Sequence, residues 1–227
     1  MIPLKDDIPS ARFPAVNTAL IVVSSLVFLF EAGLGGGLGP FVYRHGVVPS
    51  RLLSHGFADW GTILTSMFLH GGWAHVIGNM LYLYIFGDNI EDAMGHVRYL
   101  LFYLLCGFGA SWAHVLAGPG SAVPTIGASG AIAGVLGAYL ILYPRAGVLT
   151  LIPLGFFFRI VRVPAVVVLG FWIVLQIILG LISLPLAGGA RGGTAWFAHI
   201  GGFVAGVAMV KLFAGRSARR AARYNPV

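Results

Sequence analysis

Long runs without charge alternate with short charged segments along this chain of 227 residues. The uncharged runs extend over residues 13–30, 60–87, 99–144, 163–190 and 192–210. A helix needs about 20 apolar residues to cross a bilayer, so the third run is too long for one helix. Gly118, Pro119 and Pro124 interrupt it, since glycine and proline break helices. The pattern predicts an all-α polytopic membrane protein with six transmembrane helices, at 14–32, 71–88, 98–117, 126–144, 163–184 and 195–213.

The composition supports a membrane protein. Hydrophobic residues make up 58% of the chain and charged residues 9%, whereas a soluble domain carries about 25% charged residues. The formal net charge of +7 could suggest nucleic-acid binding. The basic residues lie in short loops and in the C-terminal tail rather than on one face, which argues against that function. Cys106 is the single cysteine, so the chain has no intramolecular disulfide and no cysteine-based metal site.

The positions of lysine and arginine predict the orientation. With the N-terminus in the cytoplasm, only Arg44, Arg51 and Arg191 of the 14 basic residues fall outside. Because basic loops are retained on the cytoplasmic side, this orientation is favoured, and both termini are then cytoplasmic. The predicted parts are a cytoplasmic tail (1–13), a membrane domain (14–213) and a basic cytoplasmic tail (214–227). The first segment lacks the pattern of a transit peptide, which favours a bacterial plasma membrane.

The loop between the first two predicted spans is long. It has about 40 residues, and loops of this length are commonly functional. It contains a glycine run at 35–37 and then the segment Pro49–Leu53, which is able to start a short helix. Its mixed apolar and aromatic residues predict a packed element at the outer membrane surface.

Four polar residues stand out inside the predicted spans. His75 and Asn79 lie in the second span, Ser129 begins the fourth and His199 lies near the start of the sixth. At about 1.5 Å per residue, the serine and both histidines lie roughly 18–24 Å above the cytoplasmic edge. The fourth span is too short to reach the outer edge, which predicts a water-accessible depression above Ser129. Polar groups buried in a membrane are costly and mark functional sites.

Small residues predict close packing of the fourth and sixth spans. Gly130 with Gly134, and Gly202 with Gly206, form G-x-x-x-G patterns that let transmembrane backbones approach closely. Such packing would bring the imidazole of residue 199 within hydrogen-bond reach of the hydroxyl of residue 129. Singly, these side chains have simpler roles, because a transmembrane serine can bond its own helix and polar residues can join helices. Jointly they favour catalysis, because they share one leaflet.

Three motifs in the chain resemble the rhomboid family of intramembrane serine proteases. The segment GASGA at 127–131 is similar to the family's serine motif, and AHIGG at 198–202 is similar to its base motif. The segment 70–80, with His70, His75 and Asn79, is similar to its second-span signature. The resemblance covers nearly the whole chain in the basic six-span form. It implies a Ser–His dyad of Ser129 and His199 without a third acid, no metal or cofactor, and transmembrane proteins as substrates.

The resemblance also implies supporting roles. The oxyanion would be held by Asn79, His75 and the backbone N–H groups of Ser129 and Gly130. Substrate access would involve a lateral gate on the fifth span with Phe171, Trp172 and Gln176, and a mobile cap in the loop 188–193 with Arg191. Two positions depart from the family pattern. Trp60 is followed by Gly61 rather than arginine, and Ala133 stands where an aromatic residue often stacks on the base, so other packing must hold the base.

The sequence leaves two other functions to consider. An inactive rhomboid-like binding protein would keep the fold without cleavage, although such proteins usually lack the serine or the base. A small transporter would be expected to have intramembrane charges or an inverted repeat, and neither is visible. Zinc and aspartyl intramembrane proteases are disfavoured, because the chain has no H-E-x-x-H motif and no pair of intramembrane aspartates. The sequence specifies neither the substrate nor the oligomeric state.

Overall fold

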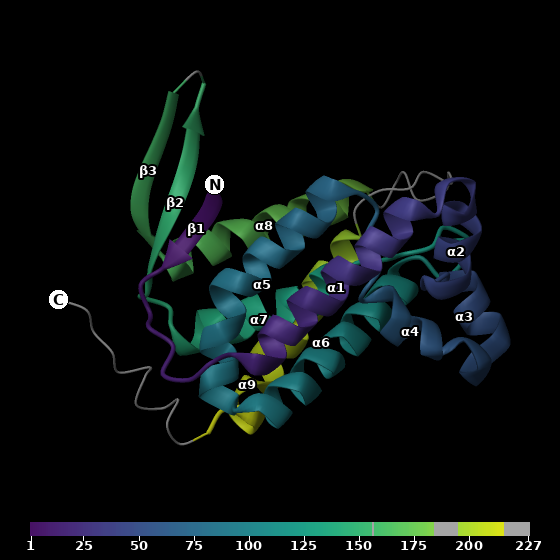
Figure 1. The fold of residues 1–227 in the computed structure, drawn as a ribbon, viewed down its shortest axis with the longest axis horizontal. Helices are drawn as coiled ribbons and strands as arrows, with labels where there is room; N and C mark the ends of the chain where they lie inside the picture. The colour runs from purple at the N-terminus through teal and green to yellow at the C-terminus, as the bar shows by residue number, and fades with distance from the viewer. Residues whose placement is uncertain (156, 184–194, 216–227) are drawn as a thin grey trace.

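The computed structural model describes residues 1–155, 157–183 and 195–215 of the chain. Its α-helices are α1 (Ala15–Gly33), α2 (Leu38–His45), α3 (Pro49–His55), α4 (Gly61–Ser66), α5 (Trp73–Met94), α6 (His96–Ala117), α7 (Ser129–Leu142), α8 (Ala165–Ser183) and α9 (Trp196–Phe213). The 3-10 helices are η1 (Gly35–Gly37) and η2 (Gly56–Asp59), and the strands are β1 (Ile2–Asp6), β2 (Gly147–Leu154) and β3 (Phe157–Pro164). Figure 1 shows the long helices packed together, with α2, α3 and α4 at one end, which we call the loop end. The three-stranded sheet lies at the other end, which we call the sheet end.

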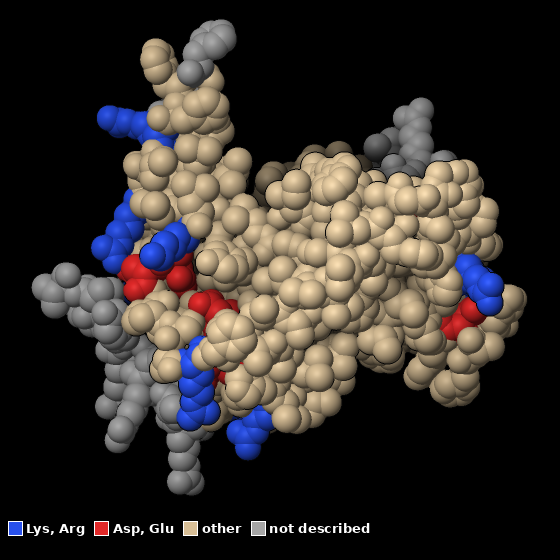
Figure 2. Space-filling model, in the orientation of Figure 1, with Lys and Arg blue, Asp and Glu red and all other residues tan. Residues whose placement is uncertain are grey.

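Apolar side chains cover the outside of the long helices. Four of these, α1, α6, α8 and α9, are long and apolar enough to cross a membrane, and α7 is a shorter apolar helix of 14 residues. Leu26 on α1 and Leu181 on α8 are each more than half exposed. Figure 2 shows charged side chains at the two ends of this face and an uncharged surface between them. Water solvates such a band poorly, so the chain is an integral membrane protein with lipid around this band.

The central helix of the bundle is α7, which contacts α5, α6, α8 and α9. Most of its side chains are small or aliphatic, and nearly all are buried. The segment predicted as a span at 126–144 contains this helix, with observed bounds of Ser129 and Leu142. The other predicted spans coincide with helices to within a few residues, except at the end of α5.

Helix α5 continues to Met94, past its predicted end at residue 88. The buried carboxylate of Glu91 accepts hydrogen bonds from the backbone N–H groups of Val16 at 2.9 Å and Asn17 at 2.7 Å. These N–H groups belong to the first turn of α1, where they have no partner within the helix and where the helix dipole favours negative charge. Because the N-terminus of α1 compensates this carboxylate, α5 can continue through it.

The prediction of an all-α chain is wrong for the segment between α7 and α8 and for the N-terminus. Strands β2 and β3 form an antiparallel hairpin, with Val148 opposite Val163 and Thr150 opposite Val161, and β1 pairs with β2. Branched and aromatic residues recur in these strands and favour extended backbone. Gly155, with a φ of +65°, supplies the left-handed conformation of the turn. The N-terminal segment predicted as a tail therefore contributes a strand to a sheet.

Asp6 joins strand β1 to the helices. Its carboxylate accepts hydrogen bonds from the Tyr139 hydroxyl and from the Asn89 amide, the latter at 2.8 Å. Burial, reinforced by the nearby Asp88, raises the pKa of Asp6 to about 6. Since the folded state binds this proton more tightly than the unfolded state, the free energy of unfolding decreases as the pH rises from about 4 to about 6.

Asp6→Asn is expected to remove this pH dependence. Between about pH 4 and pH 7, the wild-type chain should lose about 1 kcal/mol more unfolding free energy than the variant, a value kept small because Asp6 is partly exposed. Unfolding in detergent micelles at several pH values, followed by circular dichroism, measures the difference. Equal pH slopes for the two proteins would contradict the role assigned to this carboxylate.

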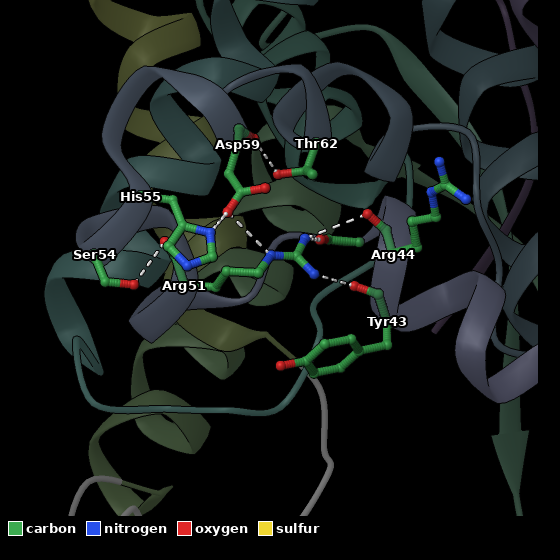
Figure 3. A network of polar contacts seen from close by, with 8 residues as sticks. Tyr43, Arg44, Arg51, Ser54, His55, Asp59 and Thr62 are labelled. Atoms are coloured by element: carbon green, nitrogen blue, oxygen red, sulfur yellow. Dashed lines mark hydrogen bonds and ion pairs between the residues drawn. The ribbon is translucent and has the colours of Figure 1, made fainter.

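Arg51 organises the loop end, as Figure 3 shows. Its guanidinium donates hydrogen bonds to the carbonyl oxygens of Tyr43 at 2.6 Å, Arg44 at 3.3 Å and Gly46 at 3.2 Å. It also forms an ion pair with Asp59 at 3.2 Å. The three carbonyls lie at the C-terminal end of α2, where a cation is favoured, so one side chain joins α2, α3 and η2. The predicted short helix starting at Pro49 is confirmed as α3.

Arg51→Ala is expected to loosen the loop end. Without the charge-assisted hydrogen bonds, the local stability should fall by about 2 kcal/mol, and hydrogen exchange of the amides of 43–47 should accelerate about thirtyfold. Mass spectrometry of exchange in detergent measures this rate. Arg44→Ala is the matched control, because it removes the same charge from the same loop and its guanidinium has no partner in the described part of the chain. Equal acceleration in both variants would contradict the assigned role of the Arg51 hydrogen bonds.

Candidate active site

A backbone bend before α7 presents Ser129. An antiparallel bridge between Val47 and Thr125 holds the preceding segment, and the Gly127 N–H donates to the Ser66 carbonyl at 2.9 Å. Gly127 has a φ of +126°, and a Cβ there would lie 2.7 Å from Nε2 of the His75 ring. Only glycine fits a position with this backbone conformation and this neighbour. The serine therefore begins α7 directly after a bend that packs on the imidazole of residue 75.

Ser129 and His199 meet across α7 and α9. Oγ of Ser129 lies 2.8 Å from Nε2 of His199, and His199 is 8% exposed. The two backbones are so close that a Cβ at Gly202 would collide with the carbonyl oxygen of Gly130. The close approach of these helices, which the G-x-x-x-G patterns predict, is confirmed.

The His199 ring is enclosed by three side chains. Oε1 of Gln176 lies 2.7 Å from Nδ1. The ring centroid of Trp172 lies 5.7 Å from that of His199 with a tilt of 36°, and Trp196 lies edge-on at 6.3 Å. Trp172 and Gln176 both belong to α8, whereas α7 has only Ala133 one turn after the serine. The imidazole is therefore held from α8 and from its own helix.

Several hydrogen-bond donors lie near the serine hydroxyl. The Gly71 N–H donates to Nδ1 of His75 at 3.3 Å, so the neutral imidazole carries its hydrogen on Nε2, the atom next to the bend at Gly127. The Asn79 amide nitrogen is buried and has no hydrogen-bond partner within the described ranges. The N–H groups of Ser129 and Gly130 lie in the first turn of α7, where no helical carbonyl precedes them. Such donors can stabilise a developing negative charge.

A cleft of about 720 Å³ opens beside Ser129 and His199. Its walls come from α5, α7, α8 and α9 and include Asn79, Tyr82, Leu136 and Trp172. Residues of both α5 and α8 line the cleft, and these two helices make no extensive contact with each other, so the cleft lies between them. Its volume falls within the range of about 300–1,000 Å³ that is usual for ligand sites. A smaller cavity of about 20 Å³, room for one water, also borders the serine and contacts Ser66, Ser111 and His114.

The cleft brings together most of the residues that the sequence predicts for a site. The residues at or lining it are Ser129, His199, His75, Asn79 and Trp172. Gly130 borders the smaller cavity, whereas Phe171 is half exposed on α8. Arg191 and the loop 188–193 lie outside the described residues. Among the residues that the structure describes, no three His, Cys, Asp or Glu side chains are placed to hold a metal ion.

Two polar contacts near the site are not anticipated from the sequence. One is the hydrogen bond from His199 to Gln176, a residue that the sequence assigns to the gate. The other involves Glu31 on α1, which is 1% exposed and accepts the backbone N–H of His70 at 3.0 Å. The His70 ring in turn packs edge-on against His75 at 5.2 Å. The sequence signal for such a contact is a polar residue at the edge of an apolar run. The same signal also marks the end of a transmembrane span, so it does not identify the contact.

The fold and the site define a polytopic helical membrane protein with a serine–histidine pair beside a cleft between its helices. The Rhomboid domain family model matches residues 58–216, more than half of the chain. The chain therefore belongs to the rhomboid family, and the family predicted from its motifs is confirmed.

Two relatives show the extent of the similarity. Rhomboid-like protein 11, chloroplastic, of Arabidopsis thaliana is 28% identical over 195 residues, which cover 83% of this chain and 65% of that protein. Rhomboid protease GluP of Bacillus subtilis (strain 168) is 36% identical over 115 residues, which cover 51% of this chain and 22% of that protein. The chain thus spans less than two-thirds of the length of either relative.

Proposed function

We propose that this chain is an intramembrane serine endopeptidase that cleaves transmembrane proteins, with Ser129 as nucleophile and His199 as general base. The observation that carries the proposal is the 2.8 Å contact between Oγ and Nε2 of these residues, at the edge of a cleft between membrane helices. A serine hydroxyl is a weak nucleophile until an adjacent base takes its proton. Family membership and the similarity to a protein named as a rhomboid protease support the proposal.

The reaction would be an acyl transfer in two steps. Nε2 of His199 takes the Ser129 proton as Oγ attacks the scissile carbonyl carbon, and the oxyanion is stabilised by Asn79, His75 and the N–H groups of Ser129 and Gly130. The imidazolium then protonates the leaving amine as the C–N bond breaks, which leaves an acyl-enzyme. Water, deprotonated by the same imidazole, hydrolyses the ester and restores the serine.

The cleft suggests a route for the substrate. A transmembrane helix could approach from the lipid between α5 and α8, which make no extensive contact, and pass Trp172. The same proposal assigns Phe171 to this gate and Arg191 to the cap. A hydrogen-bonded helix shields its carbonyl groups, so the substrate must unwind before attack. We therefore expect a preference for spans that contain glycine or proline, with a small residue before the cut.

The proposed topology has six spans, α1 and α5 to α9. Both termini would be cytoplasmic, with the active site toward the outer side of a bacterial plasma membrane. Arg145 precedes β2 and Arg162 lies within β3 at the sheet end, and Arg44 and Arg51 lie at the loop end. The larger share of basic residues falls at the sheet end, which agrees with a cytoplasmic location for it.

Purified protein in lipid nanodiscs tests the proposed activity. We expect it to cleave a single-span substrate that has Gly-Pro in the span, and a fluorophosphonate to label Ser129, as located by mass spectrometry. A matched poly-Leu span should be cleaved much more slowly, and equal cleavage would contradict the need for unwinding. Binding of the substrate without cleavage or labelling would favour an inactive binding protein. Ion flux in liposomes without cleavage would favour a transporter.

A further inference from the structure

Gln176 contacts the Nδ1 edge of the His199 ring, whereas Ser129 contacts Nε2. It is 5% exposed on α8, and its Oε1 lies 2.7 Å from Nδ1 of the imidazole. Its Nε2 donates to the backbone carbonyl of Trp172 at 3.4 Å. That bond orients the amide, because only the oxygen then faces the imidazole.

The contact selects one tautomer of the imidazole. An amide oxygen only accepts hydrogen bonds, so the hydrogen of neutral His199 must be on Nδ1, and the Nε2 lone pair then faces the Ser129 hydroxyl. In the other tautomer, Nε2 would carry a hydrogen and could not accept the serine proton, and Nδ1 would oppose the amide oxygen with a lone pair. His75 from α5 and His114 from α6 are titratable groups close enough to influence the ring electrostatically. Neither forms a hydrogen bond with it in the described part of the chain.

We propose that Gln176 is a positioning residue for His199, which it holds in the tautomer and orientation that accept the proton of Ser129. This inference rests on the proposed function. It gives Gln176 a role in the chemical step, beyond the gate role that the sequence implies. Both the hydrogen bond to Nδ1 and the Trp172 ring come from α8, so the helix that walls the cleft also holds the base.

The rate at which a small, water-soluble fluorophosphonate labels Ser129 tests this role. Such a probe needs the base but does not pass a lateral gate as a helix, so it separates positioning from gating. Gln176→Leu removes the acceptor and should lower the labelling rate about 10- to 100-fold. Leu175→Ala, on the exposed side of the same helix, should leave the rate unchanged.

Gln176→Glu keeps an acceptor at the same place and adds a negative charge. It should label at close to the wild-type rate at high pH. The low-pH limb of its profile of labelling rate against pH should shift to higher pH by about one unit or more, because a carboxylate stabilises the imidazolium. The shift requires that the side chain at position 176 contacts the imidazole in the working enzyme, so an unmoved limb would contradict the positioning role. The profile also tests the proposal if the leucine variant fails to fold, which thermal unfolding would show.

The outcomes separate the two proposals. Wild-type protein that neither labels nor cleaves would overturn the proposed function. Wild-type protein that labels, together with a folded Gln176→Leu variant that labels at the same rate, would overturn only the positioning role. Slower cleavage of a helical substrate with unchanged labelling would assign Gln176 to the gate instead.

Discussion

Ser129→Ala is expected to lower the rate of substrate cleavage by at least about ten-thousand-fold and to abolish fluorophosphonate labelling. The variant lacks the oxygen that forms the acyl-enzyme, while the cleft and the hydrogen-bond donors remain. Cleavage of the Gly-Pro substrate in nanodiscs measures the loss, and thermal unfolding shows that the fold is kept. Ser24→Ala is the matched control, because Ser24 is a buried serine of α1 whose hydroxyl has no partner within the described residues.

The same measurement tests whether the two side chains act as one unit. His199→Ala should reduce cleavage by a similar factor, because it removes the imidazole that contacts the Ser129 hydroxyl. The double variant should be no slower than either single variant, since effects within a catalytic unit are not additive. Losses that multiply in the double variant would contradict a shared proton transfer. Residual cleavage near the wild-type rate in either single variant would contradict the proposed mechanism itself.

Gly206→Ala is expected to destabilise the fold by about 3 kcal/mol or more and to abolish activity through loss of structure. A methyl group at Gly206 would collide with the backbone of Gly134, at the contact between α9 and α7. The two helices would have to separate, although the substitution changes neither Ser129 nor His199. Unfolding in detergent and cleavage of the test substrate measure the two effects together.

Gly170→Ala is the matched control for that substitution. Gly170 lies within α8, and a Cβ there would meet no atom within 4 Å. Alanine should therefore be tolerated and should stabilise the helix by up to about 1 kcal/mol through its higher helix propensity. If both alanine variants unfold alike, the packing of α7 on α9 does not depend on the small size of residue 206.

The positions of the helices follow from the sequence because a bilayer requires long uncharged runs. The prediction misses two places where a local rule is overridden by a distant partner. Glu91 continues α5 because the N-terminus of α1, 75 residues away, compensates its charge. The pairing of β1 with β2 is missed because these strands are far apart in the chain, and a count of apolar residues does not reveal strand pairing.

The candidate site shows the same division. The residues Ser129, His199, His75 and Asn79 can be selected from the sequence, because polar groups are rare within apolar spans and because their motifs resemble those of a family. The contacts around these residues cannot be predicted from the sequence. From the sequence, Gln176 is assigned to the gate. In the fold, its amide oxygen contacts the His199 ring. Arg51 likewise becomes the anchor of the loop end only once α2 and α3 are packed.

The sequence by itself determined that this chain lies in a membrane, where its apolar helices run and which polar residues are candidates for its site. These properties depend on composition, on run length and on short motifs, each of which is local in the chain. Only the tertiary structure decided which side chains meet, how the imidazole is oriented, and where a sheet and a cleft form. Those properties depend on distances of a few ångströms between residues far apart in sequence, and a linear pattern does not contain such distances.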